Sequence, residues 1–166
     1  MKLLIHILSI FLLTACGEGF NAGFSKGVKA DTNTGLTASY NGFMFNDIYL
    51  ADEKENKLPD NKIILGSKLA IVATGVDNFV EKNGKVFPGC TILLTDSKGQ
   101  VILKIDDAFS DMTEGSLAKE TKVLKASLNT GAPMVVGETY NLLVRFYDKN
   151  KHENEIISKV DLLVKE

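Results

Sequence analysis

Apolar and polar residues alternate along several short stretches of the chain, and a period of two residues predicts β-strands. The clearest pair covers residues 90–95 and 100–105, on either side of the turn-forming sequence Asp96-Ser97-Lys98-Gly99. The stretch 68–76 is apolar on both faces, as is typical of a central strand. Residues 106–120 break the alternation, and we expect one turn of helix there. Further strands are predicted over 43–50, 63–65, 121–128, 137–148 and 155–164.

These elements indicate an all-β domain with about seven strands and without a long helix. Amphipathic strands bury their apolar faces by forming two packed layers. We therefore predict an antiparallel two-sheet sandwich, and a closed barrel is the alternative. Asn83-Gly84, inside the polar segment 77–89, predicts a further tight hairpin turn.

One strand carries a more specific signal. Tyr140 follows Gly137-Glu138-Thr139 and begins a strand in which it shares one face with Leu142, Val144 and Phe146. This Gly-x-x-Tyr entry resembles the tyrosine corner of Ig-like and fibronectin-like sandwiches, although the Cys and Trp hallmarks of Ig domains are absent. The resemblance implies an Ig-like architecture, with Tyr140 in a structural role.

The N-terminal segment has the layout of a secretory signal. Lys2 precedes the apolar run 3–13, which is shorter than the roughly 20 residues of a membrane-spanning helix. The sequence Leu13-Thr14-Ala15-Cys16 resembles the lipobox of bacterial lipoproteins. The resemblance implies cleavage before Cys16, a diacylglyceryl group on its thiol, and anchoring to a membrane. An ordinary secretory signal with a nearby Cys is the alternative.

The expected organisation follows from this resemblance and from composition. Residues 1–15 are the lipoprotein signal, residues 16–38 a Gly-rich flexible tether, and residues 39–166 the β-sandwich. In lipoproteins an Asp after the lipidated Cys favours the inner membrane, and this chain has Gly17 instead. We therefore expect the outer membrane of a bacterial envelope. Whether the domain faces the periplasm or the outside is left open.

Charge and cysteine content narrow the possible partners. The formal net charge is -2, and Arg145 is the only arginine, so the Arg and Lys clustering of a nucleic-acid surface is missing. We predict no nucleic-acid partner. If Cys16 carries lipid, Cys90 has no disulfide partner, and its apolar neighbours predict a buried thiol.

No residues have the pattern of a catalytic site. His152 is the only histidine after the signal and lies in a charged turn, where we expect it to be solvated. No serine has a Gly-x-Ser-x-Gly setting, and no Gly-rich phosphate loop follows a strand. We predict that the protein is not an enzyme and has no cofactor.

Four acidic residues are candidate calcium ligands: Asp106, Asp107, Asp111 and Glu114. Calcium prefers several carboxylate and carbonyl oxygens, which an irregular acidic segment can supply. Their spacing does not fit the EF-hand pattern, so we predict no metal site and keep the four residues as weak candidates.

The remaining function is binding. An anchored domain without catalytic residues is expected to bind another envelope or surface protein, through loops or an exposed strand edge. The alternative is a module for glycans or another small extracellular ligand, with Tyr49 and Tyr147 as stacking residues. The chain has no Trp and only four Tyr, which weakens that alternative.

Overall fold

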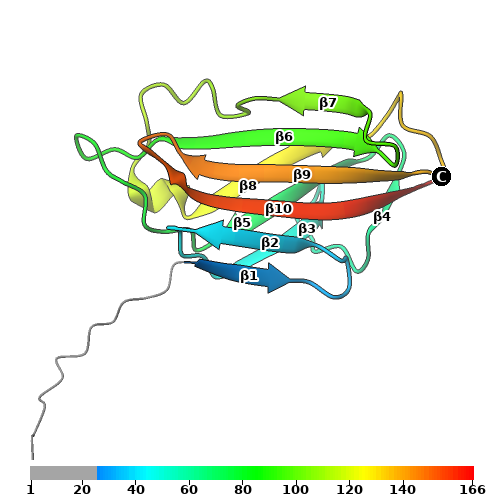
Figure 1. Cartoon of the computed structure of the whole chain (residues 1–166), viewed down its shortest axis with the longest axis horizontal. Coiled ribbons are helices and arrows are strands. Elements are labelled where there is room, and N and C mark those ends of the chain that lie inside the picture. Colours follow the sequence, from blue (N-terminus) through cyan, green and yellow to red (C-terminus); the bar gives the residue numbers. More distant parts are fainter. Residues whose placement is uncertain (1–25) are drawn as a thin grey trace, which may run out of the picture.

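The computed structural model describes residues 26–166, and within them the protein is all-β. These residues form ten strands and one short 3-10 helix, η1, and Figure 1 shows how they are arranged. The strands are β1 (Lys26–Ala30), β2 (Thr37–Asn41), β3 (Asp47–Asp52), β4 (Lys62–Ile64), β5 (Lys68–Thr74), β6 (Pro88–Asp96), β7 (Val101–Ile105), β8 (Val123–Asn129), β9 (Thr139–Asp148) and β10 (Lys151–Lys165), and η1 covers Ala118–Thr121.

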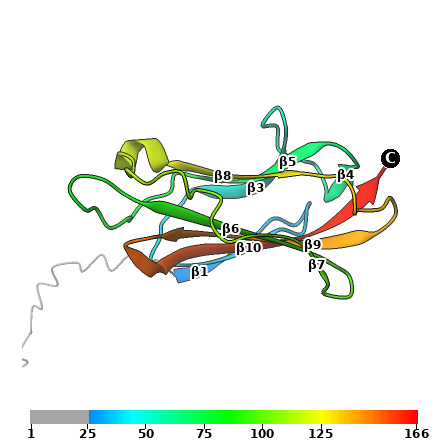
Figure 2. The ribbon, with the colours of Figure 1, turned by 90° about the horizontal axis from the view of Figure 1, so that it is seen from above.

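The strands form two sheets that pack as layers, which are seen edge-on in Figure 2. The large sheet has seven strands, in the order β1-β2-β10-β9-β6-β7, with β4 beside the end of β10. The small sheet has the order β3-β5-β8. All pairings are antiparallel except that of β4, which runs parallel to β10. The alternative of a closed barrel is wrong, because the described strands divide between two separate sheets.

The topology confirms the predicted Ig-like sandwich. The small sheet holds β3, β5 and β8, while β6, β7, β9 and β10 face it, so the chain crosses repeatedly between the layers. Ig-like domains place strands A, B, E and D against C, F and G, and here β4, between β3 and β5 in the chain, pairs with β10 in the large sheet. Strands β1 and β2 are added at the edge next to β10.

Alternation along the strands builds the core between the two layers. In β9 the inward residues Tyr140, Leu142, Val144 and Phe146 are all buried, as predicted. Strand β5 is buried on both faces, which confirms it as a central strand. Its outer face is covered because Ala70 and Val72 form a second small cluster with Ala51, against which Tyr49 packs.

The flexible tether expected over residues 16–38 includes residues that form strands. Residues 26–30 and 37–41 form the hairpin β1–β2, and β2 pairs with β10, so the expectation of irregular chain up to residue 38 is wrong for these strands. Gly27 allows this pairing because a Cβ atom there would lie 2.7 Å from the hydroxyl of Tyr40. The expected signal (1–15), Cys16 and the first ten residues of the expected tether (16–25) lie outside the described residues.

The local turn predictions are confirmed. Asp96 Oδ1 accepts hydrogen bonds from the amides of Lys98 (2.9 Å) and Gln100 (2.8 Å) in the turn between β6 and β7. Asn83 and Gly84 both have positive φ, and their flanking lysines exchange two backbone hydrogen bonds, which makes a tight hairpin turn. The predicted helical turn is η1. The strand predicted from residue 43 begins only at Asp47.

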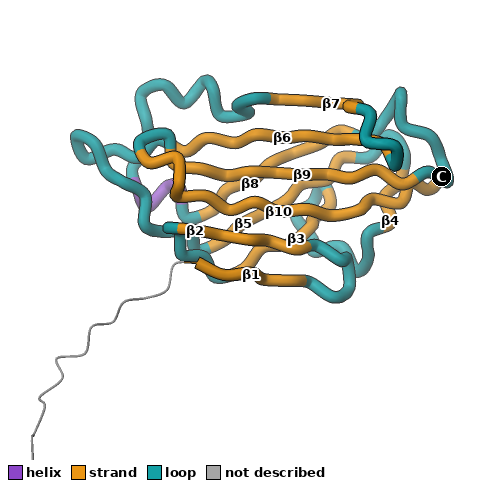
Figure 3. The backbone as a smooth tube through the Cα atoms, viewed as in Figure 1, coloured by secondary structure: helices purple, strands orange, loops and turns teal. Residues whose placement is uncertain are grey.

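The loops divide between two ends of the sandwich, as Figure 3 shows. Residue Lys26 begins β1 at the end that carries the loops 75–87 and 106–117 and the β9–β10 turn. The opposite end carries β4 and the loop 130–138 beside the end of β10. Within residues 26–166, no helix is long and apolar enough to cross a membrane.

Candidate functional site

The four acidic candidates of the loop after β7 are not gathered into one site. Asp106 pairs with Lys104 at the surface, with 2.8 Å between Oδ1 and Nζ. Asp107 pairs with Lys149 at 2.6 Å. Across residues 26–166, no three His, Cys, Asp or Glu side chains are placed so that they could hold a metal ion.

Asp107 instead fixes the loop to the large sheet. Its Oδ1 accepts hydrogen bonds from the amides of Cys90 (3.0 Å) and Phe109 (2.9 Å), and Lys149 also donates to the Phe109 carbonyl at 3.0 Å. Burial raises the pKa of the Asp107 carboxyl, but the Lys149 hydrogen bond and the two amides outweigh burial and hold the pKa below its ordinary value. This carboxylate is therefore a structural brace.

Cys90 is a free, fully buried cysteine directly beside this brace. Burial, helped by the negative charge of Asp107, raises the pKa of its thiol to about 12. A reactive cysteine needs a lowered pKa and access to solvent, so Cys90 acts as a small core residue.

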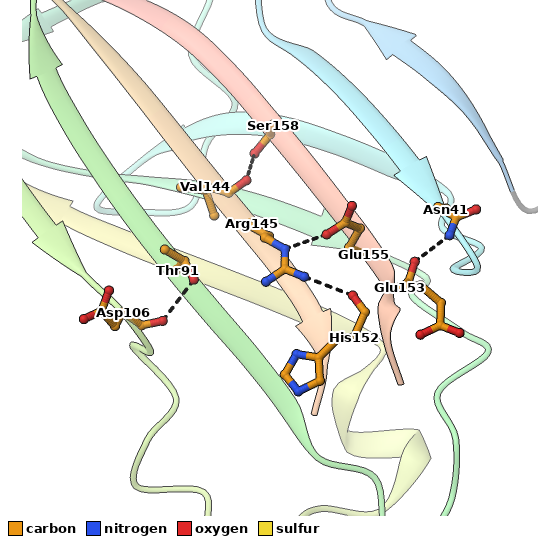
Figure 4. A network of polar contacts seen from close by, with 9 residues as sticks. All are labelled: Asn41, Thr91, Asp106, Val144, Arg145, His152, Glu153, Glu155 and Ser158. Carbon is orange, nitrogen blue, oxygen red and sulfur yellow. Dashed lines mark hydrogen bonds and ion pairs between the residues drawn. The ribbon is translucent and has the colours of Figure 1, made fainter. Parts of the chain in front are cut away.

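A polar cluster lies on the outer face of the large sheet, at a bulge in β10 (Figure 4). The register between β9 and β10 shifts between Lys151 and Glu155, which leaves residues 152–154 as the bulge. Arg145 contacts both sides of this bulge. Its Nε pairs with Glu155 Oε2 at 2.5 Å, and its Nη2 donates to the His152 carbonyl at 3.0 Å. Asn41 on β2 donates to the Glu153 carbonyl at 2.6 Å.

This cluster joins the only arginine to the only histidine after the expected signal. The His152 ring stacks on Tyr147, with 5.4 Å between centroids, and the Arg145 guanidinium lies 4.6 Å from the same ring centre. His152 is exposed, as expected, but it belongs to β10 and is stacked on a neighbouring ring. Burial raises the pKa of the Tyr147 phenol, which keeps it protonated at neutral pH. The cluster fixes the bulge and supplies no activated nucleophile.

The two tyrosines of the glycan alternative differ in how far neighbouring side chains cover them. Tyr147 is 8% exposed because Arg145 and His152 pack against it. Tyr49 is half-buried on the outer face of the small sheet, with Lys57 Nζ 4.5 Å from its ring centre. Tyr147 therefore offers little surface for stacking on a sugar, whereas part of Tyr49 remains exposed.

Tyr140 has a local structural contact of the kind that the resemblance implies. Its hydroxyl accepts a hydrogen bond from the Val135 amide at 2.9 Å, in the loop that precedes β9. Its ring is buried in the core. The contact ties the loop 130–138 to the strand that follows it.

Nine large apolar side chains are exposed among residues 26–166, and three of them, Ile64, Val135 and Val136, lie in β4 and the loop 130–138; we call these three the distal surface. Others, such as Val80 and Leu117, lie in loops at the opposite end. The exposed fractions of Ile64, Val135 and Val136 are 59%, 56% and 40%. Both segments that carry the distal surface are fixed to the end of β10, since the Leu65 amide donates to the Lys165 carbonyl and the Gly137 amide to the Val164 carbonyl, each at 2.9 Å. Apolar side chains held exposed on ordered backbone are suited to contact another protein.

A cleft of about 340 Å³ adjoins Ile64. Its apolar residues are Leu58, Ile63, Ile64 and Leu69, and its charged residues are Asp52, Glu53, Lys54, Lys62 and Lys68. Asp60 pairs with Lys62 at 3.2 Å, while no ion pair within residues 26–166 involves Lys54 or Lys68. The cleft therefore combines apolar contact area with charged groups of both signs.

The distal surface was not predicted, although the sequence holds a partial signal for it. Ile63 and Ile64 are adjacent in a strand, so one of the two must face away from the core. Val135 and Val136 stand between Pro133 and Gly137 in a segment with the turn composition of a loop. The sequence could not show that the two segments meet at the end of β10. No protein-family model and no curated protein matches this chain.

Proposed function

We propose that the protein is a lipoprotein of the bacterial cell envelope, anchored through Cys16, whose Ig-like domain binds another envelope or surface protein through the distal surface. The observation that carries the proposal is that β1 begins at one end of the sandwich, while β4 and the loop 130–138, which carry Ile64, Val135 and Val136, lie at the other end. It supports a binding domain that carries exposed apolar side chains at the end opposite the start of β1.

The anchor rests on the sequence Leu13-Thr14-Ala15-Cys16. Each buried CH₂ of an acyl chain contributes about 0.8 kcal/mol, so one chain binds a membrane reversibly and two or more hold a protein stably. A diacylglyceryl group on the Cys16 thiol supplies two chains. Gly17 in place of Asp favours the outer membrane in our proposal.

The reach of the domain from the lipid follows from covalent geometry. Ten residue steps separate Cys16 from Lys26. A fully extended chain spans at most 3.3–3.6 Å per residue, so Lys26 lies within roughly 35 Å of a lipid on Cys16. The end of the sandwich at which β1 begins is then held within that distance of the membrane, and β4 and the loop 130–138 lie at the opposite end.

The chemistry of the distal surface supports a protein partner. Ile64 adjoins the cleft that carries Lys54 and Lys68 as well as Asp52 and Glu53, so apolar groups and charged groups of both signs lie side by side. A complementary patch would combine apolar side chains with charges of both signs, because complementary charge steers association and apolar contact supplies affinity. No observation favours the glycan alternative, since Tyr147 is buried and Tyr49 is half-buried.

Site-specific photo-crosslinking in intact cells tests the proposal. A photoreactive residue at Val135 probes the distal surface, and the same residue at Val80, in the loop 75–87, is the matched control at the opposite end. We expect a discrete adduct with one envelope protein at position 135 that is lost in an Ile64→Lys background, and none at position 80. Equal labelling at both positions, or an adduct that survives Ile64→Lys, would contradict the proposal.

A further inference from the structure

Among residues 26–166, the two sheets end in the edge strands β1, β3, β7 and β8, and the three-residue strand β4 forms a further short edge beside β10. Free edges offer unpaired backbone groups to other chains, and proteins commonly protect them with very short strands, charges turned inward, bulges or covering loops. Three of the four longer edges here have such a device. Strand β8 has none, which sets it apart.

The protected edges differ in how they are blunted. On β1, the ammonium of Lys29 turns back and donates to the carbonyls of Phe45 (2.9 Å) and Asn46 (2.8 Å). The edge of β3 is covered by its own following loop, since the Leu58 amide donates to the Leu50 carbonyl at 2.9 Å. The register of β7 against β6 shifts after Leu94, which marks a bulge in this edge.

The backbone of β8 presents its free groups in a regular row. Its register with β5 is unbroken over seven residues, from Val123 to Asn129. The Thr130 amide donates to the Ser67 carbonyl at 2.9 Å in the same register, so the even-numbered residues bond to β5. In an antiparallel ladder the intervening residues point their amides and carbonyls to the other side. Four residues therefore present free groups at the edge: Val123, Lys125, Ser127 and Asn129.

We propose that β8 pairs antiparallel with β8 of a second copy of this chain, about a two-fold axis at Ala126. In this register Val123 lies opposite Asn129 of the second copy, and Lys125 opposite Ser127. All four residues with free groups on each strand then face one another, and an isologous interface of this kind closes as a dimer. The two small sheets join into one sheet that crosses the dimer.

Charge and side-chain size fit this register. Lys125, the only charged residue of β8, lies opposite a serine, so no like charges are directly opposed. Its ammonium is paired with Glu55, from the loop after β3, at 2.6 Å and therefore reaches across β5, away from the free edge. On the core side, the small Ala126 meets its own copy, and Leu124 lies opposite Leu128 of the second copy. An alternative register, shifted by two residues, has its two-fold axis at Lys125. It would place the Lys125 residues of the two copies directly opposite each other.

Two substitutions of opposite charge at Ser127 test the proposed register. Ser127 is exposed, so Ser127→Glu and Ser127→Lys leave the core unchanged. In the proposed dimer, residue 127 of each copy lies opposite Lys125 of the other copy. The Ser127→Glu variant therefore forms two pairs of opposite charge, and the Ser127→Lys variant forms two pairs of like charge. Cross-strand charge pairs of this kind change the dimer Kd by roughly 2- to 30-fold in total, tighter for Glu and weaker for Lys. Ser127→Ala is the control, with a Kd close to that of the wild type.

The measurement is sedimentation velocity of the full chain in detergent micelles over a range of protein concentrations, with the same detergent for all variants. Amide hydrogen exchange gives a second readout. We expect Lys125 and Ser127 to gain protection with concentration, and Ala126 to be protected throughout. A monomer at every concentration, an equal Kd for the Glu and Lys variants, or dimer protection confined to other strands would overturn the proposal.

Discussion

The ring of Tyr147 lies against the backbone of Gly89 on the neighbouring strand, where the two residues are paired across β9 and β6. A Cβ atom at position 89 would lie 2.2 Å from ring atom Cζ and 2.4 Å from Cε2. Arg145 and His152 pack against the same ring, so it has little room to move. A glycine at position 89 is therefore a condition for the cluster at the β10 bulge.

Gly89→Ala is expected to destabilise the domain. Overpacking a filled site costs about 1–3 kcal/mol, which denaturant unfolding of the variant measures. The cost should shrink when Tyr147→Ala is combined with it, because the two residues are in contact and their effects are not additive. Gly131→Ala is the control, since nothing lies within 4 Å of its Cβ position. Equal losses at positions 89 and 131 would contradict this packing.

Tyr140→Phe tests the contact at the start of β9. The variant keeps the buried ring and removes the hydroxyl that accepts from the Val135 amide. One hydrogen bond of this kind contributes about 1 kcal/mol net, so we expect a loss of that size in the free energy of unfolding. The second expected effect is faster hydrogen exchange at Val135. Tyr40→Phe serves as the comparison, and a loss at position 40 as large as at position 140 would count against a role for the hydroxyl.

Asp107→Asn is expected to lose stability in a pH-dependent way. The pKa of this carboxyl is lowered in the folded protein, so its ionised form stabilises the fold above its ordinary value of 3.8. That contribution is lost as the pH falls through the lower folded pKa. A buried charged hydrogen bond contributes roughly 1.5–3 kcal/mol, so unfolding at pH 7 should show a penalty of that order, which diminishes below pH 3.8.

The neighbouring residue supplies the control for this variant. The Asp106 side chain is 82% exposed, and an ion pair at the surface adds little stability. Asp106→Asn should change the free energy of unfolding by no more than about 0.5 kcal/mol at any pH. If Asp106→Asn and Asp107→Asn behave alike, then Asp107 does not brace the loop as described.

Features set by neighbouring residues were predictable from the sequence. The turn between β6 and β7 is one, because the Asp96 carboxylate bonds to amides only two and four residues further along the chain. Alternation in β9 likewise predicts the inward face from Tyr140 to Phe146, and it places Arg145 and Tyr147 together on the outer face. These patterns report which face a side chain takes.

Features set by distant strands were not predictable. Strand β1 carries Gly27 and two lysines, which weakens any strand pattern, and its pairing depends on Tyr40 lying over Gly27. The bulge at residues 152–154 brings His152 onto Tyr147, and only the register between β9 and β10 defines it. The acidic residues of the loop after β7 were grouped by closeness in sequence, whereas in an irregular segment their side chains take separate directions.

The most direct test of the central claim, anchoring through Cys16, compares Cys16→Ala with Cys90→Ala after membrane fractionation of expressing cells. Cys90 is buried and free, so its variant controls for the loss of a thiol. We expect the wild type and Cys90→Ala to remain in the membrane fraction with lipid on residue 16, detected by the mass of the N-terminal peptide. A Cys16→Ala protein should lack the lipid and, once its signal is cleaved, leave the membrane fraction. A Cys16→Ala protein that stays membrane-bound after cleavage, or a wild-type Cys16 without lipid, would contradict the account.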